Sequence, residues 1–333
     1  MNKTPFFSFL VPNYGYSKYL FECFDSLINQ KTNEEFDYDI LVCDQNDLDI
    51  YNKIKKECLE KYGDKINFIH NDIKGVLRAR HTLVRNAKGK YCIFVDSDDF
   101  VDLDYLYVIF ENLKKNNNPD ILMFNYIKCD ENGADNPSLY TPFICDKEYL
   151  MDYFLYSNYF NELVRKAFKR ELYVVDDTVD MESVICDDWL MSFPLMVKAK
   201  NIIYLPEIQK YHYRVNSNSL THTVKFDEAM KNISVHDQYL STYTPNNLQK
   251  KIFTSQTLMT YVALGDMLIK DKTLTKQQFI DFSNNAKKHL YDIDINDEEQ
   301  YVMSKNHKML YKLLNKNAYL RLKTIFKVRK LLK

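Results

Sequence analysis

Residues 90–102 read KYCIFVDSDDFVD, an apolar run that ends in a cluster of carboxylates. The run 90–96 is typical of a buried strand, because apolar residues without polar alternation are covered on both faces. Asp96, Asp98 and Asp99 then stand within four positions. Their charges repel one another and resist removal from water, so a compensating partner is expected. A divalent cation is one such partner, and a solvated turn that caps the following helix is the other reading.

The chain before and after this stretch alternates between strand and helix periods. Because such alternation is typical of a sheet covered on both sides, we expect an α/β fold with a mainly parallel sheet and helices on both faces. Polar residues follow several strands directly, and parallel strands gather their carboxyl ends at one edge, where ligands bind. The expected strands are 6–11, 38–44, 66–71, 90–96 and 120–127, and the expected helices are 18–30, 49–63, 76–89 and 103–116.

Composition limits the classes of function. The 333 residues carry a formal net charge of -1, so no overall field favours nucleic acid. The seven cysteines are scattered and odd in number, which favours a reducing, cytoplasmic setting over a disulfide framework. We found no glycine-rich phosphate loop and no apolar run of 18 residues. Beyond about residue 226 the pattern is helical to the end of the sequence, which predicts a separate helical region.

Several polar motifs follow one another in a fixed order, and together they resemble those of the family-2 glycosyltransferases, which have the GT-A fold. The resemblance spans about residues 6–222, and its motifs are FSFLVPNYGYSKYLFECFDSLINQ (7–30), ILVCDQND (40–47), NDIKGVLRARH (71–81), FVDSDDFVD (94–102), NELVRKAFKREL (161–172), CDDWLMSFPL (186–195) and YHYRVNSNSLTH (211–222). The sequence departs from the family pattern at Gly15, Gln45 and His81.

The resemblance implies a role for each matching residue. Asp188 corresponds to the catalytic base, and Asp44 to the aspartate that reads the base of the nucleotide. Asp98, with Asp96, would hold Mn²⁺ or Mg²⁺, although the spacing alone leaves open whether Asp98 or Asp99 is the direct ligand. The residues expected at the nucleotide sugar are Pro12, Tyr14, Asp44, Gly75, Arg80, Asp96 and Ser97.

Three further side chains each have more than one role that the sequence allows. His212 and His222 are candidates for a third metal ligand or a phosphate contact, although a lone histidine is more often structural. Trp189, the one tryptophan, follows Asp188 and could stack on an acceptor sugar or pack in the core.

The resemblance predicts a catalytic domain at 1–222, with nucleotide-sugar binding at about 1–130 and the acceptor side at about 131–222, and a helical region at 223–333. The expected activity is metal-dependent, inverting transfer of a sugar from a UDP-sugar to a glycan, glycolipid or glycoprotein in bacterial surface-glycan or glycoprotein assembly. A catalytically inactive sugar-nucleotide-binding or assembly subunit is the alternative. The basic segment 305–333 has apolar residues at helical spacing, so it could lie on an anionic membrane surface or pack against the body or a second subunit.

Overall fold

The computed structural model describes residues 4–136, 161–173, 187–215, 224–242 and 259–290, with Lys312 and Lys316. These residues divide into two compact units, and the first of them contains everything described up to residue 215. His222, and the segment 305–333 apart from the two lysines, lie outside the described residues, so the expectations for them stay predictions. The functional domain boundary expected at residue 222 also stays a prediction. None of the described helices combines the length and the apolar character that a membrane crossing requires.

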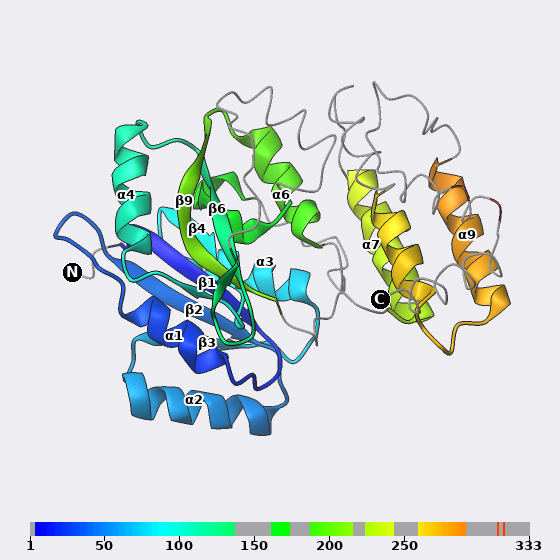
Figure 1. Ribbon diagram of the computed structural model, residues 1–333, viewed down its shortest axis with the longest axis horizontal. Coiled ribbons are helices and arrows are strands. Elements are labelled where there is room, and N and C mark those ends of the chain that lie inside the picture. The colour runs from blue at the N-terminus through cyan, green and yellow to red at the C-terminus, as the bar shows by residue number, and fades with distance from the viewer. Residues whose placement is uncertain are drawn as a thin grey trace. The chain divides into compact units, whose positions relative to one another are not determined.

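Nine strands form one sheet among the described residues of the first unit (Figure 1). Their order is β3-β2-β1-β4-β8-β6-β9-β5, with β7 paired to β6. The strands are β1 (Phe7–Asn13), β2 (Tyr38–Asp44), β3 (Ile66–His70), β4 (Tyr91–Phe94), β5 (Phe100–Val101), β6 (Ile121–Cys129), β7 (Asp135–Asn136), β8 (Lys166–Lys169) and β9 (Ile202–Arg214).

The first four strands are parallel, and their register brings their carboxyl ends together. Asn13 of β1 lies beside Asp44 of β2, which lies beside His70 of β3. On the other side of β1, the N–H of Val95, directly after β4, donates to the carbonyl of Leu10. The register therefore confirms that the carboxyl ends of these strands lie together at one edge of the sheet.

The sheet is mixed, which agrees with the expected mainly parallel sheet, but its antiparallel strands were not recognised from the sequence. β8 pairs antiparallel with both β4 and β6, and β5 pairs antiparallel with β9. Both β5 and β8 are short, and β8 begins and ends with a lysine, so neither has the long apolar run by which a strand is recognised. β9 continues to Arg214, because its second half pairs with β5 and β6.

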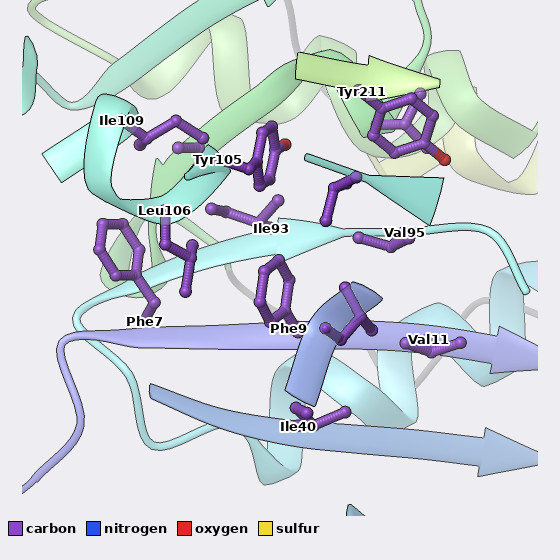
Figure 2. Close-up of a cluster of buried hydrophobic side chains, with 14 of the residues drawn as sticks. Phe7, Phe9, Val11, Ile40, Ile93, Val95, Tyr105, Leu106, Ile109 and Tyr211 are labelled. Atoms are coloured by element: carbon purple, nitrogen blue, oxygen red, sulfur yellow. The ribbon is translucent and has the colours of Figure 1, made fainter. Parts of the chain in front are cut away.

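Helices cover both faces of the sheet, as predicted. α1 (Leu20–Ile28), α2 (Leu48–Tyr62) and α4 (Tyr105–Lys115) share one buried cluster with the side chains that alternate along β1. Figure 2 shows Phe7, Phe9 and Val11 of β1 in this cluster, together with Tyr105, Leu106 and Ile109 of α4. α3 (Val76–Asn86) packs against β1 and β2, and α6 (Asp187–Lys198) contacts α3. Burial of these aromatic and aliphatic side chains holds the strand ends in fixed positions.

The second unit is helical where it is described, as the sequence predicts. It contains α7 (Phe226–Thr242), helical residues 259–268 and α9 (Lys276–Leu290). Leu264 and Phe279 are fully buried, and the rings of Tyr261 and Phe282 lie 6.1 Å apart. Apolar side chains at helical spacing thus form a core of their own in this unit.

Candidate active site

Residues 96–99, which we call the aspartate turn, follow β4 at the carboxyl edge of the sheet. Asp96, Ser97 and Asp98 are half-buried, whereas Asp99 is only 2% exposed. The carboxylate of Asp99 accepts hydrogen bonds from the hydroxyl of Tyr211 at 2.6 Å and from the backbone N–H of Arg214 at 2.8 Å. None of these residues caps the next helix, because α4 has Asp104 at its N-cap position. The capping interpretation is therefore wrong.

Burial raises the pKa of each aspartate of the turn. The pKa of Asp96 is raised to about 6, with Asp188 and Asp98 adding to the effect of burial and Arg80 opposing it. Burial also raises the pKa of Asp98, and it raises that of Asp99 well above its ordinary value. Because a bound cation would favour the charged carboxylates, the turn suits a hard divalent ion.

The turn could supply only part of a cation's coordination shell. Among the described residues, no group of three or more His, Cys, Asp or Glu side chains is placed to hold a metal ion. Mg²⁺ and Mn²⁺ commonly take one or two protein carboxylates and complete their shell with phosphates and water. Asp96 and Asp98 therefore fit an ion that arrives with a phosphate ligand, and they do not fit a structural metal site.

Arg80 joins the aspartate turn to the start of α6. Its guanidinium Nη1 donates to Oδ1 of Asp188 at 2.7 Å, and Nη2 donates to Oδ1 of Asp96 at 3.3 Å. The Arg80 side chain is 5% exposed, whereas the two carboxylates are each about a third exposed. The buried guanidinium of Arg80 thus holds two accessible carboxylates that lie 92 positions apart in the chain. The contact with the nucleotide sugar that we expect for Arg80 stays a prediction.

Asp188 occupies the first turn of α6, where the helix presents it toward Arg80. The next residue, Trp189, is 2% exposed, and its ring lies 6.4 Å from that of Phe193 in an edge-on arrangement. Of the two readings for Trp189, core packing is the one that this burial supports. The hydrophobic side of α6 therefore anchors the helix, and the carboxylate of Asp188 in its first turn stays accessible.

Asp44 is fully buried beneath the sheet edge. Its Oδ2 accepts hydrogen bonds from the side-chain amides of Asn13 at 2.7 Å and Asn46 at 3.0 Å, and its Oδ1 accepts the backbone N–H of Asn46 at 2.9 Å. The side-chain carbonyl of Asn46 in turn accepts the N–H of Gly15 at 2.7 Å. In this arrangement a nucleotide base cannot contact Asp44 directly, so the role predicted for Asp44 requires Asn46 to move.

Gln45 holds the loop between β3 and α3 in place at the same edge of the sheet. Its side-chain amide donates to the carbonyl of Ile73 at 2.7 Å, and its side-chain carbonyl accepts the N–H of Gly75 at 3.1 Å. Gly75 has a φ of 138°, a conformation that favours glycine, and α3 begins directly after it. The departures from the family pattern at Gly15 and Gln45 thus each take part in a hydrogen bond that holds a loop at this edge.

The other residues expected at the nucleotide sugar lie around this edge. Tyr14 is 57% exposed, and Nζ of Lys74 donates to its hydroxyl at 2.8 Å. Pro12 is the next-to-last residue of β1 and is half-buried, as is Ser97. An exposed aromatic ring beside an ammonium group leaves Tyr14 available to a planar ligand.

The structure does not support His212 as a metal ligand. Its ring nitrogens lie 2.8 Å from Oδ1 of Asp102 and 3.0 Å from Oδ1 of Asp135, and its ring stacks on Phe100 at 4.4 Å. Both nitrogens are engaged by these carboxylates, so His212 joins β9 to β5 and β7.

Two groups near the site were missed from the sequence. Arg214, 3% exposed, donates through Nε to the carbonyl of Asp98 at 3.0 Å. Lys166 is fully buried, donates to the carbonyl of Glu162 at 2.7 Å, and has a pKa lowered by burial to about 7. The motifs around both residues were noted, but only three-dimensional pairing reveals their partners.

Comparison with known proteins gives the class of this chain. Residues 8–179, more than half of the chain, match Glycosyl transferase family 2. The chain therefore belongs to glycosyl transferase family 2, and the predicted family is confirmed.

Among curated proteins, it is 34% identical over 122 residues to the Poly(ribitol-phosphate) beta-glucosyltransferase of Bacillus spizizenii, a match that covers 35% of this chain and 18% of the relative. The matched region spans less than a fifth of the length of several curated relatives.

Solved structures show the same fold at low identity. Residues 1–349 of S. aureus TarS in complex with UDP superpose with a TM-score of 0.59 and 15% identity, covering 98% of this chain and 92% of the other. The mannosyltransferase PcManGT of Pyrobaculum calidifontis, in complex with GDP-Man and Mn²⁺, superposes with a TM-score of 0.53 and 14% identity, covering 97% and 87%. These similarities confirm the expected GT-A type of fold.

Proposed function

We propose that this protein is a metal-dependent, inverting glycosyltransferase that moves a sugar from a nucleotide diphosphate donor, a UDP-hexose, to a hydroxyl group of a glycan, glycolipid or glycoprotein. The observation that carries the proposal is the pair of contacts from Arg80 to Asp96 and Asp188. Asp96 follows a strand at the edge where α/β sheets bind ligands, and Asp188 begins the neighbouring helix. In this proposal Asp96 contacts the donor and Asp188 accepts the proton, and the contacts of Arg80 with both carboxylates support this pairing.

Asp98 and Asp96 are the residues that would hold Mn²⁺ or Mg²⁺ at the donor diphosphate. When bound, such a cation stabilises the negative charge that develops on the leaving diphosphate. The complexes of structural neighbours with UDP, and with GDP-Man and Mn²⁺, support this part of the proposal. The name of the B. spizizenii relative, a Poly(ribitol-phosphate) beta-glucosyltransferase, supports a polymer as the acceptor.

In the proposed reaction, Asp188 accepts the proton of the acceptor hydroxyl. The acceptor oxygen then forms a bond to the anomeric carbon while the bond from that carbon to the diphosphate breaks. A single displacement of this kind inverts the anomeric centre, and nucleoside diphosphate leaves. The hydrogen bond from Arg80 orients the carboxylate of Asp188, and general-base assistance of this type contributes about 10²–10⁴-fold to the rate.

The test is release of nucleoside diphosphate from a panel of sugar nucleotides, with Mn²⁺, with Mg²⁺ and with EDTA. We expect slow hydrolysis of one donor, which EDTA and Asp98→Ala both abolish. Asp72→Ala is the matched control, because Asp72 is exposed and stands two residues after the end of β3, at the same edge of the sheet. Calorimetric titration with UDP and Mn²⁺ covers the case without hydrolysis. Binding without turnover, even with candidate acceptors, would favour an inactive subunit, and no metal-dependent binding would overturn the proposal.

A further inference from the structure

The aspartate turn is fastened to the end of β9 by a set of buried hydrogen bonds. The hydroxyl of Tyr211 donates to Oδ2 of Asp99 at 2.6 Å and accepts the backbone N–H of Asp96 at 3.2 Å. The backbone N–H of Arg214 donates to Oδ1 of Asp99 at 2.8 Å. Both carboxylate oxygens of Asp99 therefore already accept a hydrogen bond from β9.

Arg214 extends this fastening from the turn to α1. Its Nε donates to the backbone carbonyl of Asp98 at 3.0 Å, and its Nη2 donates to Oε2 of Glu22 on α1 at 2.8 Å. The guanidinium lies 4.2 Å from the centre of the Tyr19 ring, and the Arg214 side chain is 1% exposed. The backbone of the turn is thus held between β9 and α1, whereas the side chain of Asp98 stays half-buried.

We propose that Asp99 is a positioning residue that orients the aspartate turn, and that Asp98, with Asp96, is the group that faces the cation. The inference rests on the proposed function, because it concerns the cation of the donor site. Asp99 is 2% exposed, so it could reach a cation only by giving up its bonds to Tyr211 and Arg214. Asp98 can turn toward solvent while its backbone carbonyl stays bound to Arg214.

Tyr211 and Asp99 act as one unit in this arrangement. Tyr211→Phe removes a donor to Asp99 and an acceptor for the N–H of Asp96, which leaves both groups buried without that partner. Asp99→Asn replaces an acceptor with a donor opposite the same hydroxyl. Unsatisfied buried polar groups destabilise the surrounding structure, so either change loosens the turn. The two effects overlap, and the double variant is therefore no worse than the more affected single variant.

The experiment measures Mn²⁺ binding by electron paramagnetic resonance in the presence of UDP, and Tm in EDTA. Tyr213→Phe is the matched control, since Tyr213 is half-buried and stands two residues further along β9. We expect Asp98→Asn to weaken Mn²⁺ binding most and to leave Tm unchanged. Asp99→Asn and Tyr211→Phe should weaken Mn²⁺ binding by about 10–100-fold, as loss of a supporting residue does. Both should lower Tm by about 5 °C, and the control should change neither quantity.

Two results would overturn the inference. One is loss of Mn²⁺ binding in Asp99→Asn without a fall in Tm, since a direct ligand would behave in this way. The other is unchanged Mn²⁺ binding in Asp98→Asn. Failure of the proposed function is distinguishable, because wild-type protein would then bind no Mn²⁺ with UDP. In that case an unchanged Tm in Tyr211→Phe would still refute the positioning role, and a lowered Tm would support it.

Discussion

Replacing Arg80 by methionine tests the central contact of the site without any knowledge of the substrate. Met keeps an unbranched apolar chain in place of the arginine stem, but it removes the charge that faces Asp96 and Asp188. Two carboxylates would then share one partly buried region without a cation. We therefore expect Arg80→Met to fold less stably than wild type in the absence of metal.

The magnitude follows from burial. Removing one partner of a fully buried ion pair costs about 3–5 kcal/mol. Here the arginine side chain is 5% exposed, but Asp96 and Asp188 are 31% and 33% exposed, so solvent screens part of the remaining charge. We expect the free energy of unfolding to fall by about 2–3 kcal/mol. Adding Asp188→Asn should recover part of this loss, because it removes one of the two like charges.

Urea denaturation at pH 7.5 in EDTA, followed by circular dichroism, measures the change. Arg85→Met is the matched control, since Arg85 is exposed on the same helix. Its free energy of unfolding should stay within about 0.5 kcal/mol of wild type. If Arg80→Met is as stable as Arg85→Met, or if Asp188→Asn adds its own loss to that of Arg80→Met, the bridging role of Arg80 is refuted.

Two further predictions concern buried polar groups. Because burial lowers the pKa of Lys166 to about 7, the folded protein releases this proton above pH 7 while the unfolded chain keeps it. Stability should therefore rise between pH 7 and 9, by at most about 1.4 kcal/mol per pH unit. Lys166→Met should remove that rise in urea denaturation at pH 7, 8 and 9, and an unchanged slope would contradict the assignment. Asn46→Ala should cost about 2 kcal/mol, because it removes bonds to Asp44 and Gly15. Asn46→Asp should cost more, since it sets a second carboxylate beside Asp44, and equal losses in the same assay would contradict this reason.

The parts of the fold that depend on local pattern were predictable. β1 to β4 are short apolar runs that end at polar residues, and α1 to α4 have apolar residues at helical spacing, so neighbouring residues suffice to recognise them. β8 depends instead on its partners. Its central Ala167 and Phe168 pair with residues of β4 that lie 74 and 76 positions earlier in the chain. The same two residues pair with residues of β6 that lie 45 and 47 positions earlier. No local pattern encodes that pairing.

The candidate site divides in the same way. The motifs gave the positions of Asp96, Asp98 and Asp188, because the polar residues stand directly after strands or at a helix start. They did not reveal that Asp99 faces inward, since burial of that carboxylate is decided by Tyr211, 112 positions later. The position of His212 between two carboxylates was hidden for the same reason.

The bonds that fix the aspartate turn also set an order of events during synthesis. Asp99 leaves the ribosome long before its partners, because Tyr211 and the backbone of Arg214 are 112 and 115 positions further along the chain. At about 5–20 residues per second, that separation corresponds to roughly 6–23 s of translation. For this interval β1, β2 and β4 are already available to pair, but the turn beyond them has no strand to hold it. A ribosome-bound chain that stops before Tyr211 should therefore carry the sheet edge without a fixed aspartate turn.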